Sequence, residues 1–391
     1  MEEDGRQDQL MKSKKVLLVA GEVSGDLLGS HLVEATQEID PEIEFFGIGG
    51  EGLRRRGMRI LYPSQSLAVV GLTEVFLKIG TILRALQRLK RSLEEERPDL
   101  VILIDFPDFN LRLAKIAYRK GIPILYYVSP QVWAWRRGRV KLISRCVKKM
   151  VVLFPFEVSF YEREGVDVEW VGHPLIDIVK PTLSKEEAYQ RFGLDPLRRT
   201  VALLPGSRQK EVERLLPPLL EASHLLSQEI PDLQFIIPLA HGISLKGLLK
   251  QPPSSSPLRV VEGWTYDVMN LSELLITASG TATLEGAILG KPMVILYKLS
   301  TLSYWIGRML VQVDHIGLVN LVAEKGIVPE LIQEEANPKR IAEEAFRILK
   351  DPICAQKMVE LISGVRTRLG ESGASRRAAR IVYSMLHEGE G

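Results

Sequence analysis

Lys15–Ala20 (KVLLVA) runs directly into Gly21–Asp26 (GEVSGD), and this stretch decides the fold. The first segment is almost entirely apolar, as expected of a parallel strand buried on both faces. The second is rich in small residues that allow a sharp turn, and a helical pattern follows it. A helix cap formed by Ser24 or Asp26 is the simplest role for the polar residues of the turn. Together, the strand, turn and helix predict the start of a βαβ unit.

The same pattern recurs in two series, separated by a polar, helix-rich stretch from Lys180 to Arg199. The first series continues with Glu44–Ile48, Leu100–Asp105, Ile122–Val128, Lys149–Phe154 and Val168–Val171. The second consists of Thr200–Leu204, Gln234–Pro238, Arg259–Glu262, Leu274–Ala278 and Met293–Tyr297. Two series of apolar strands predict an α/β fold with two Rossmann-like, doubly wound domains that face a cleft.

The domain boundaries follow from this pattern, since a chain of 391 residues exceeds what one hydrophobic core normally serves. Residues 1–13 are expected to form a polar tail, in which Met11 offers an alternative start. Residues 14–179 should form the first domain and residues 180–345 the second. Residues 346–391 should be C-terminal helices, which could pack back on the first domain.

Composition excludes several classes of protein. Hydrophobic residues make up 46% of the chain and charged residues 26%, which is typical of a soluble globular protein. Lys and Arg number 51 against 49 Asp and Glu, so bulk charge does not favour a nucleic acid partner. The polar, acidic first residues do not predict a secretory signal, and no membrane-spanning helix is expected because no apolar run reaches about 18 residues. Cys146 and Cys354 lie far apart, in no metal-ligand spacing, which favours a reducing, cytoplasmic setting.

Two turns of the first domain carry carboxylates where apolar strands end. Glu22 shares its turn with Ser24 and Gly25, and the motif IDFPDFN contains Asp105 and Asp108. A single carboxylate near an acceptor hydroxyl can act as a general base, so one of these two aspartates is expected to do so. The other would brace the loop or cap the next helix. The D-x-x-D spacing differs from the D-x-D of metal-dependent sugar transferases, so no metal is expected.

Two turns of the second domain suit phosphate. The motif LLPGSR places Arg208 where a buried strand ends, and its planar guanidinium can bind a phosphate there or pair with a neighbouring carboxylate. In ASGTATLE, the N–H groups and helix dipole favour an anion at Ser279, Gly280 and Thr281. Glu285 could accept hydrogen bonds from a ribose diol or simply complement the dipole. The two turns together predict a nucleotide diphosphate donor.

Two further segments could contact a partner. An apolar stripe at helical spacing suits a lipid-facing surface, although most such stripes pack on a core. Tyr127–Lys141 combines two tryptophans with closely spaced basic residues, which could stack on sugars, meet phosphate or touch RNA. A solvated basic helix is the alternative for this segment. The stripe consists of Val69, Leu72, Val75, Phe76 and Ile79.

In their order along the chain, AGEVSGD, IDFPDFN, YVSPQVWAWR, LLPGSR, ASGTATLE and LVNL resemble the lipid-A-disaccharide synthase family. The resemblance extends from about Lys14 to the C-terminal helices. It implies the GT-B architecture of glycosyltransferase family 19, with no metal and no cofactor. The implied reaction joins UDP-2,3-diacylglucosamine to 2,3-diacylglucosamine 1-phosphate with inversion. Its products are the β-1,6-linked lipid A disaccharide 1-phosphate and UDP.

The resemblance also implies roles on the acceptor side. Asp108 would be the general base that takes the proton from the acceptor 6-hydroxyl. Glu22 and Asp105 would also belong to the site, and the resemblance does not assign a separate role to each. The apolar stripe would enter the bilayer to collect acyl chains. The protein would be cytoplasmic and peripherally bound to the inner membrane, without nucleic acid. A homodimer is a possible assembly.

On the donor side, the resemblance implies that Arg208 neutralises the diphosphate and that the backbone of residues 279–281 cradles it. Glu285 and Asn320 would hold the nucleoside or sugar. Two enzymes of similar architecture are alternatives: a UDP-GlcNAc 2-epimerase, which has no use for an apolar stripe, and the transferase that adds GlcNAc to lipid-linked muramyl peptide. An RNA-binding module built on YVSPQVWAWR is the non-enzymatic alternative, disfavoured by the nearly balanced net charge.

Overall fold

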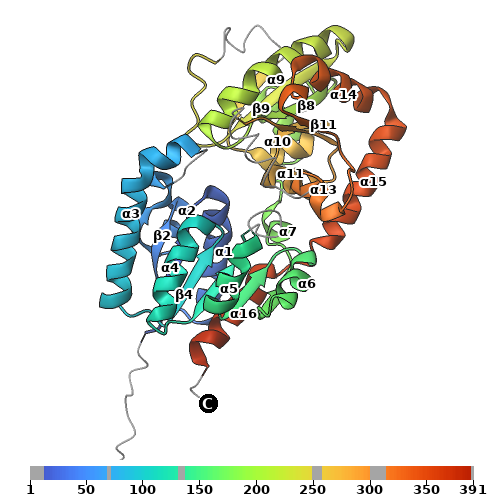
Figure 1. Cartoon of the computed structure of the whole chain (residues 1–391). Helices are drawn as coiled ribbons and strands as arrows, with labels where there is room; N and C mark the ends of the chain where they lie inside the picture. The colour runs from blue at the N-terminus through green and yellow to red at the C-terminus, as the bar shows by residue number, and fades with distance from the viewer. Residues whose placement is uncertain (1–12, 68–71, 131–136, 249–257, 300–313, 389–391) are drawn as a thin grey trace, which may run out of the picture. The chain divides into compact units, whose positions relative to one another are not determined.

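The computed structural model describes residues 13–67, 72–130, 137–248, 258–299 and 314–388 (Figure 1). It divides into two compact units. The first unit combines Met1–Gly172 with Gly373–Gly391, and the second unit is His173–Ser372. Each unit is built on one parallel sheet flanked by helices, which confirms the predicted α/β class with two doubly wound sheets.

The sheet of the first unit contains β1 (Lys15–Ala20), β2 (Glu44–Gly49), β3 (Arg59–Pro63), β4 (Leu100–Ile104), β5 (Ile124–Tyr127), β6 (Lys149–Val152) and β7 (Val168–Trp170). Their order is β3-β2-β1-β4-β5-β6-β7, so the order reverses between β1 and β4. In the register of these two strands, Ala20 pairs with Ile104. The turns after β1 and β4 therefore start side by side at the switch point, where such sheets usually bind ligands.

The helices of the first unit cover this sheet, and its last helix comes from the far end of the chain. They are α1 (Val23–Ile39), α2 (Glu51–Arg55), α3 (Leu72–Glu95), α4 (Pro107–Arg119), α5 (Val140–Cys146), α6 (Phe156–Arg163) and α16 (Ala374–His387), with 3-10 turns at Ser64–Ser66 and Arg137–Arg139. Helix α16 packs against α1 through an apolar face that includes Ala378 and Val382. An ion pair of 3.2 Å between Arg376 and Glu38 joins the two helices at the surface.

The sheet of the second unit contains β8 (Arg199–Leu204), β9 (Leu233–Leu239), β10 (Leu258–Glu262), β11 (Leu274–Ala278), β12 (Met293–Tyr297) and β13 (Glu330–Ile332). Its order, β10-β9-β8-β11-β12-β13, has a switch point between β8 and β11. Thr277 pairs with Leu204 there, so the turns after these two strands also lie together. Each of the four motifs that sequence analysis singled out at a strand end thus lies at a switch point.

The helices of the second unit include two of the three C-terminal helices. They are α7 (Leu175–Ile178), α8 (Lys185–Phe192), α9 (Gln209–Glu229), α10 (Thr265–Leu271), α11 (Thr281–Ile288), α13 (Leu318–Ala323), α14 (Pro338–Lys350) and α15 (Pro352–Arg368), with a 3-10 turn at Gln333–Glu335. Helix α14 packs on α9, and α15 packs on α11 and α13 (Figure 1). Residues 173–179 and 346–372 are therefore grouped with the second unit, and α16 with the first.

Two edge strands were missed by the sequence analysis. β3 (RILYP) is only partly buried and pairs with β2 through an irregular register at Gly47 and Ile48. β13 (ELI) has three residues. Neither strand has the continuous apolar run that marks a central strand, because an edge strand has a neighbour on one side alone. The polar tail of residues 1–12 and the segment of residues 249–257 lie outside the described residues.

Candidate active site

The turn from β4 into α4 carries both candidate base residues and has an unusual backbone. Asp105 and Phe106 adopt left-handed φ angles of 43° and 45°, a conformation that few residues other than glycine adopt. The Asn110 side-chain amide donates hydrogen bonds to the carbonyl oxygens of Ile104, at 3.1 Å, and Asp105, at 2.7 Å. The Tyr126 hydroxyl donates to the same Asp105 carbonyl at 2.6 Å. These two side chains hold the strained turn in place.

The turn after β1 fits against this strained turn. A Cβ atom added at Gly21 would lie 2.4 Å from the ring of Phe106, so no larger residue fits at this position. Glu22 precedes α1 and is partly exposed, as is Ser24, while Gly25 is buried under Ile104. The structure thereby brings together the GEVSGD and IDFPDFN turns, which start 83 residues apart in the chain, at Gly21 and Ile104.

Asp108 and Arg139 form an ion pair at this edge of the sheet. Asp108 lies in the first turn of α4 with its side chain 65% exposed, whereas the Arg139 side chain is only 17% exposed. A carboxylate so placed is open to a substrate hydroxyl. Sequence reasoning included Arg139 in a basic segment but assigned it no role, because pairing with Asp108 depends on the packing of α4 against α5.

Asp26, the last residue of GEVSGD, serves a neighbouring loop. Its carboxylate accepts hydrogen bonds from the main-chain N–H groups of Gly50 at 2.6 Å, Gly52 at 2.8 Å and Leu53 at 3.3 Å. These groups lie at the start of α2, where helix geometry leaves N–H donors without helical partners. The carboxylate therefore fastens α2 and the end of β2 to α1.

In the second unit, the LLPGSR turn connects β8 to α9. Gly206 has a φ of 118°, and the Glu211 carboxylate folds back to accept a hydrogen bond of 3.2 Å from the main-chain N–H of Ser207. Burial raises the pKa of Glu211, and the positive charge of Arg208 opposes that rise. Arg208 itself is exposed immediately before α9. The turn thus presents a guanidinium and holds the Glu211 carboxyl group against its main chain.

The ASGTATLE turn lies beside it, between β11 and α11. Gly280 has a φ of 149°, and a Cβ atom added there would meet no atom within 4 Å. The Ser279 hydroxyl donates a hydrogen bond of 3.2 Å to the Ile316 carbonyl oxygen, and Thr281 starts the helix. Open space at the N-terminus of an α-helix, next to Arg208 in the sheet order, is suited to an anion.

Glu285 lies one turn into α11, and its carboxyl group has the largest pKa shift among the carboxyl groups of this region. Burial raises its pKa to about 7, and a hydrogen bond of 3.5 Å from the Tyr266 hydroxyl acts in the opposite direction. Tyr266 is the second residue of α10, and sequence reasoning missed it because nothing near it in the chain indicates a partner on α11. Glu285 therefore changes charge close to neutral pH.

The side chain of Asn320, in α13, joins this helix by hydrogen bonds to the segment that leads into β13. It is 1% exposed, and its amide donates to the Val328 carbonyl oxygen at 2.9 Å and to Glu330 at 2.7 Å. Its oxygen accepts from the N–H groups of Ile327 and Val328. Glu330 also accepts from the N–H of Gly317. These bonds give Asn320 a positioning role, and the predicted contact with a nucleoside stays a prediction.

The apolar stripe is described in part. Ile79 and Leu83, one turn apart on α3, are 42% and 45% exposed. Val69, the side chains of Leu72, Val75 and Phe76, and the tryptophans Trp133 and Trp135 lie outside the described residues. Within the described ranges, no helix is long and apolar enough to cross a membrane. Nor do three His, Cys, Asp or Glu residues gather there as metal ligands would.

Solved structures share this fold at low sequence identity. A UDP-GlcNAc 2-epimerase from Neisseria meningitidis bound to UDP-GlcNAc matches 96% of this chain and 100% of its own, with a TM-score of 0.65 and 16% identity. The calicheamicin glycosyltransferase CalG4 matches 97% of this chain and 100% of its own, with a TM-score of 0.62 and 14% identity. Both GT-B transferases and epimerases therefore have this architecture, and the fold alone does not separate them.

Sequence relatives distinguish a transferase from an epimerase for this chain. Lipid-A-disaccharide synthases from Geobacter sulfurreducens and Nitrosococcus oceani are 49% and 47% identical to this chain. The alignments cover 96% of this chain in each case, and 98% and 97% of the two relatives. A model of the lipid-A-disaccharide synthetase family also matches residues 16–382. The chain belongs to the lipid-A-disaccharide synthase family, whose members are glycosyltransferases of lipid A disaccharide synthesis.

Proposed function

We propose that this chain transfers the sugar of UDP-2,3-diacylglucosamine to the 6-hydroxyl of 2,3-diacylglucosamine 1-phosphate. The acceptor oxygen attacks the anomeric carbon, the bond from that carbon to the diphosphate breaks, and the configuration inverts. The products are a β-1,6-linked disaccharide 1-phosphate and UDP, and the hydroxyl proton passes to a carboxylate. The observation that carries this proposal is near-full-length identity of 41–50% to lipid-A-disaccharide synthases.

Asp108 is the proposed base, because its exposed carboxylate stands in the first turn of α4 at the switch point of the first sheet. Asp105 is the alternative base. Its main-chain carbonyl oxygen already accepts two hydrogen bonds that fix the turn, which favours a supporting role. Glu22, with Ser24 and Gly25 on the adjoining turn, would contact the sugar beside this base.

The second unit would hold the donor. Arg208 would neutralise charge on the diphosphate as UDP leaves, and the turn at Ser279, Gly280 and Thr281 would cradle it with main-chain N–H groups. Glu285 would accept hydrogen bonds from the nucleoside or sugar hydroxyls. Asn320 would act through the hydrogen bonds that hold the start of α13 against Glu330. No step in this scheme uses a metal or a cofactor.

Lipid substrates call for a lipid-facing surface, and the proposed one is the apolar stripe of Val69, Leu72, Val75, Phe76 and Ile79. Exposed Ile79 and Leu83 on α3 support this surface, since large apolar side chains at the interface are stabilised by bilayer contact. The protein would then act peripherally at the cytoplasmic face of the inner membrane, where it would collect both acylated sugars.

The test is UDP release by the purified protein in mixed micelles, with UDP-2,3-diacylglucosamine given with and without the acceptor. Release that depends on the acceptor, a disaccharide phosphate in the mass spectrum and insensitivity to EDTA are expected. No acceptor-dependent release would contradict the proposal. Turnover of a UDP-sugar without any lipid would favour the epimerase instead.

The assignment of the base has its own test. Asp108→Ala should fold normally and lose most turnover, typically by a factor of about 10² to 10⁴ for a general base. Asp105→Ala is the matched variant three residues away. Near-wild-type turnover by Asp108→Ala together with loss in Asp105→Ala would transfer the role to Asp105.

A further inference from the structure

The ion pair of Asp108 with Arg139 joins an exposed carboxylate to a largely covered guanidinium. Arg139 ends the 3-10 turn at Arg137–Arg139 and directly precedes α5, which packs on α4. A guanidinium is planar and carries five donors, so it can hold a carboxylate and a second anion at once. Its position beside the proposed base would place that second anion close to the reacting hydroxyl.

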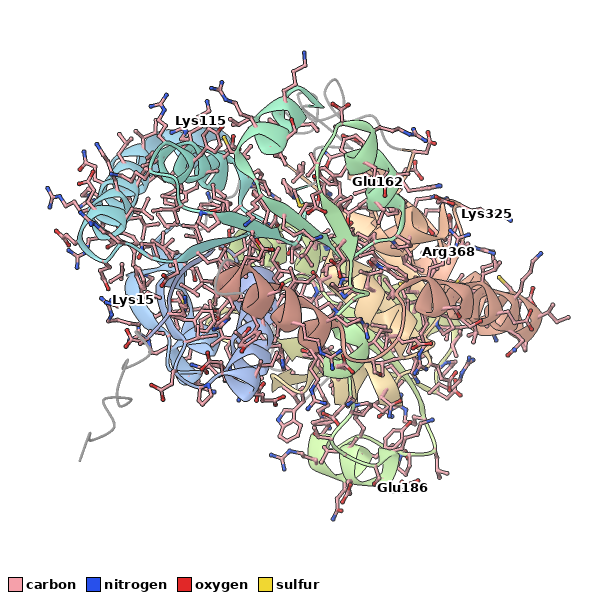
Figure 2. The ribbon with its side chains drawn as sticks, turned by 90° about the horizontal axis from the view of Figure 1, so that it is seen from below. Lys15, Lys115, Glu162, Glu186, Lys325 and Arg368 are labelled. Carbon is pink, nitrogen blue, oxygen red and sulfur yellow. The ribbon has the colours of Figure 1, made fainter. Side chains whose placement is uncertain are left out.

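The stretch of sequence that contains Asp108 is strongly basic. Asp108 is the one acidic residue between Phe106 and Phe156, a stretch that contains eleven lysines and arginines. Several of them are exposed on α4 and α5, and Figure 2 shows Lys115 on the outer surface. The charges of Lys115, Arg119 and Arg145 act on the thiol of Cys146, the last residue of α5, so these three residues lie toward that end of the helices and not beside Asp108. The exposed members on these helices are Arg112, Lys115, Arg119, Lys141 and Arg145.

We propose that Arg139 binds the phosphate monoester of the acceptor while it orients the carboxylate of Asp108, an inference that rests on the proposed function. Arg139 is then a substrate-binding residue and a positioning residue for the base. It would tie recognition of the acceptor phosphate to the placement of the group that takes the proton.

Charge and geometry both support this assignment. A phosphate monoester carries about 1.5 to 2 negative charges at neutral pH, so a lone carboxylate beside it would repel the acceptor. A guanidinium between the two anions turns that repulsion into attraction and binds phosphate oxygens with its planar fork. When the phosphate draws hydrogen bonds from Arg139, an Asp108 oxygen becomes available to the 6-hydroxyl of the same sugar.

The experiment compares two acceptors, 2,3-diacylglucosamine 1-phosphate and its phosphate-free counterpart, in micelles of a zwitterionic detergent. The quantity measured is the ratio of kcat/KM for the two acceptors, in the full-length wild type, Arg139→Gln and Lys141→Gln. Lys141→Gln is the matched control, because it removes one positive charge from the same surface two residues away. Because the ratio compares acceptors within one variant, a general loss of base function cancels.

Arg139→Gln should lower the preference for the phosphorylated acceptor by about 10- to 100-fold, mainly through KM, as expected for a lost charge-assisted hydrogen bond. Lys141→Gln should change it by less than about threefold. An unchanged preference in Arg139→Gln, with equal losses on both acceptors, would overturn phosphate recognition. Absence of any acceptor-dependent turnover in the wild type would instead contradict the proposed function.

Two further arms complete the test. If Arg139→Gln turns over neither acceptor, calorimetric binding of the two acceptors to the folded variant makes the same comparison, and Arg139→Lys should recover part of the phosphate preference. Vesicles of anionic phospholipid without acceptor distinguish a headgroup phosphate from the acceptor phosphate. Loss of vesicle binding in Arg139→Gln, without a change in acceptor preference, would assign Arg139 to the membrane and overturn the proposal.

Discussion

The side-chain amide of Asn110 donates a hydrogen bond of 2.7 Å to the main-chain carbonyl oxygen of Asp105, five residues earlier in the chain. Asn110 is fully buried, and the turn that it closes contains two consecutive residues with left-handed backbones. Strained turns persist where the surrounding structure determines them strongly, and they are common at active sites. The placement of Asp108 at the start of α4 therefore depends on a buried amide.

Asn110→Ala is expected to reduce both stability and turnover. The substitution removes the buried hydrogen bond to the Ile104 carbonyl oxygen and leaves the Asp105 carbonyl oxygen with the Tyr126 hydroxyl, which should lower the free energy of unfolding by about 1–3 kcal/mol. Urea denaturation measures this change, and UDP release measures the effect on activity. Tyr126→Phe, which removes one bond to the same carbonyl, should have a smaller effect. Unchanged stability and activity in Asn110→Ala would show that the turn holds without the amide.

Glu285→Gln should stabilise the protein at high pH. Burial raises the folded-state pKa of Glu285 from 4.5 to about 7, so folding favours the protonated carboxyl. The wild type therefore loses stability as the pH rises from about 4.5 through 7, because the charged group must then be buried. Melting temperatures should favour Glu285→Gln at pH 8 and be equal for the two proteins near pH 4. Glu221→Gln on the exposed face of α9 is the control, and an equal gain there would refute the burial argument.

Binding of UDP should weaken as the pH falls below about 7, if the Glu285 carboxylate accepts hydrogen bonds from the nucleotide. The Tyr266 hydrogen bond lowers the pKa of Glu285, so Tyr266→Phe should move the midpoint of this dependence to higher pH. Calorimetric titration with UDP between pH 5.5 and 8.5 (about three pH units around the expected midpoint) measures both effects. Glu285→Gln should abolish the dependence, and its persistence in that variant would assign the titration to another group.

Asp26→Ala should destabilise the first unit. The Asp26 carboxylate accepts three main-chain hydrogen bonds at the start of α2, and its removal should cost about 1–3 kcal/mol. Thermal unfolding measures the loss. Glu51→Gln in α2 is the control, because the Glu51 side chain is 58% exposed and pairs with surface arginines. Equal stability of the two variants would mean that water replaces the carboxylate at little cost.

Ile79→Glu combined with Leu83→Glu should weaken association with phospholipid vesicles by about tenfold or more, because each apolar side chain contributes on the order of 1.5–3 kcal/mol when buried. Sedimentation with vesicles measures the bound fraction. Leu197→Glu is the matched control, since Leu197 is an exposed apolar residue of the second unit, 90% exposed. If all three substitutions reduce binding equally, the stripe is not the contact surface.

Much of this protein could be predicted from sequence because its strands are buried. Apolar runs such as KVLLVA and LLITA mark central strands, and the small-residue turns after them mark the strand ends where ligands bind in α/β sheets. Two of the four edge strands, β3 and β13, escaped prediction because they are short or only partly buried and lack a continuous apolar run. Asp26 shows another limit, since it was one of two candidates to cap α1 and its carboxylate instead holds the start of α2.

The sequence by itself determined the two-sheet architecture, the positions of the four motif turns and the family, because each rests on local apolar patterning and on motif order. Tertiary structure alone decided the pairing of Arg139 with Asp108, of Tyr266 with Glu285 and of Asn110 with the Asp105 backbone. Arg139 and Tyr266 contact partners on other elements. Asn110 donates hydrogen bonds to a turn whose left-handed backbone is not predicted by any local sequence pattern. The physical reason is that burial and hydrogen bonding, which set the charge and position of a carboxylate, arise only when separate helices pack on a common sheet.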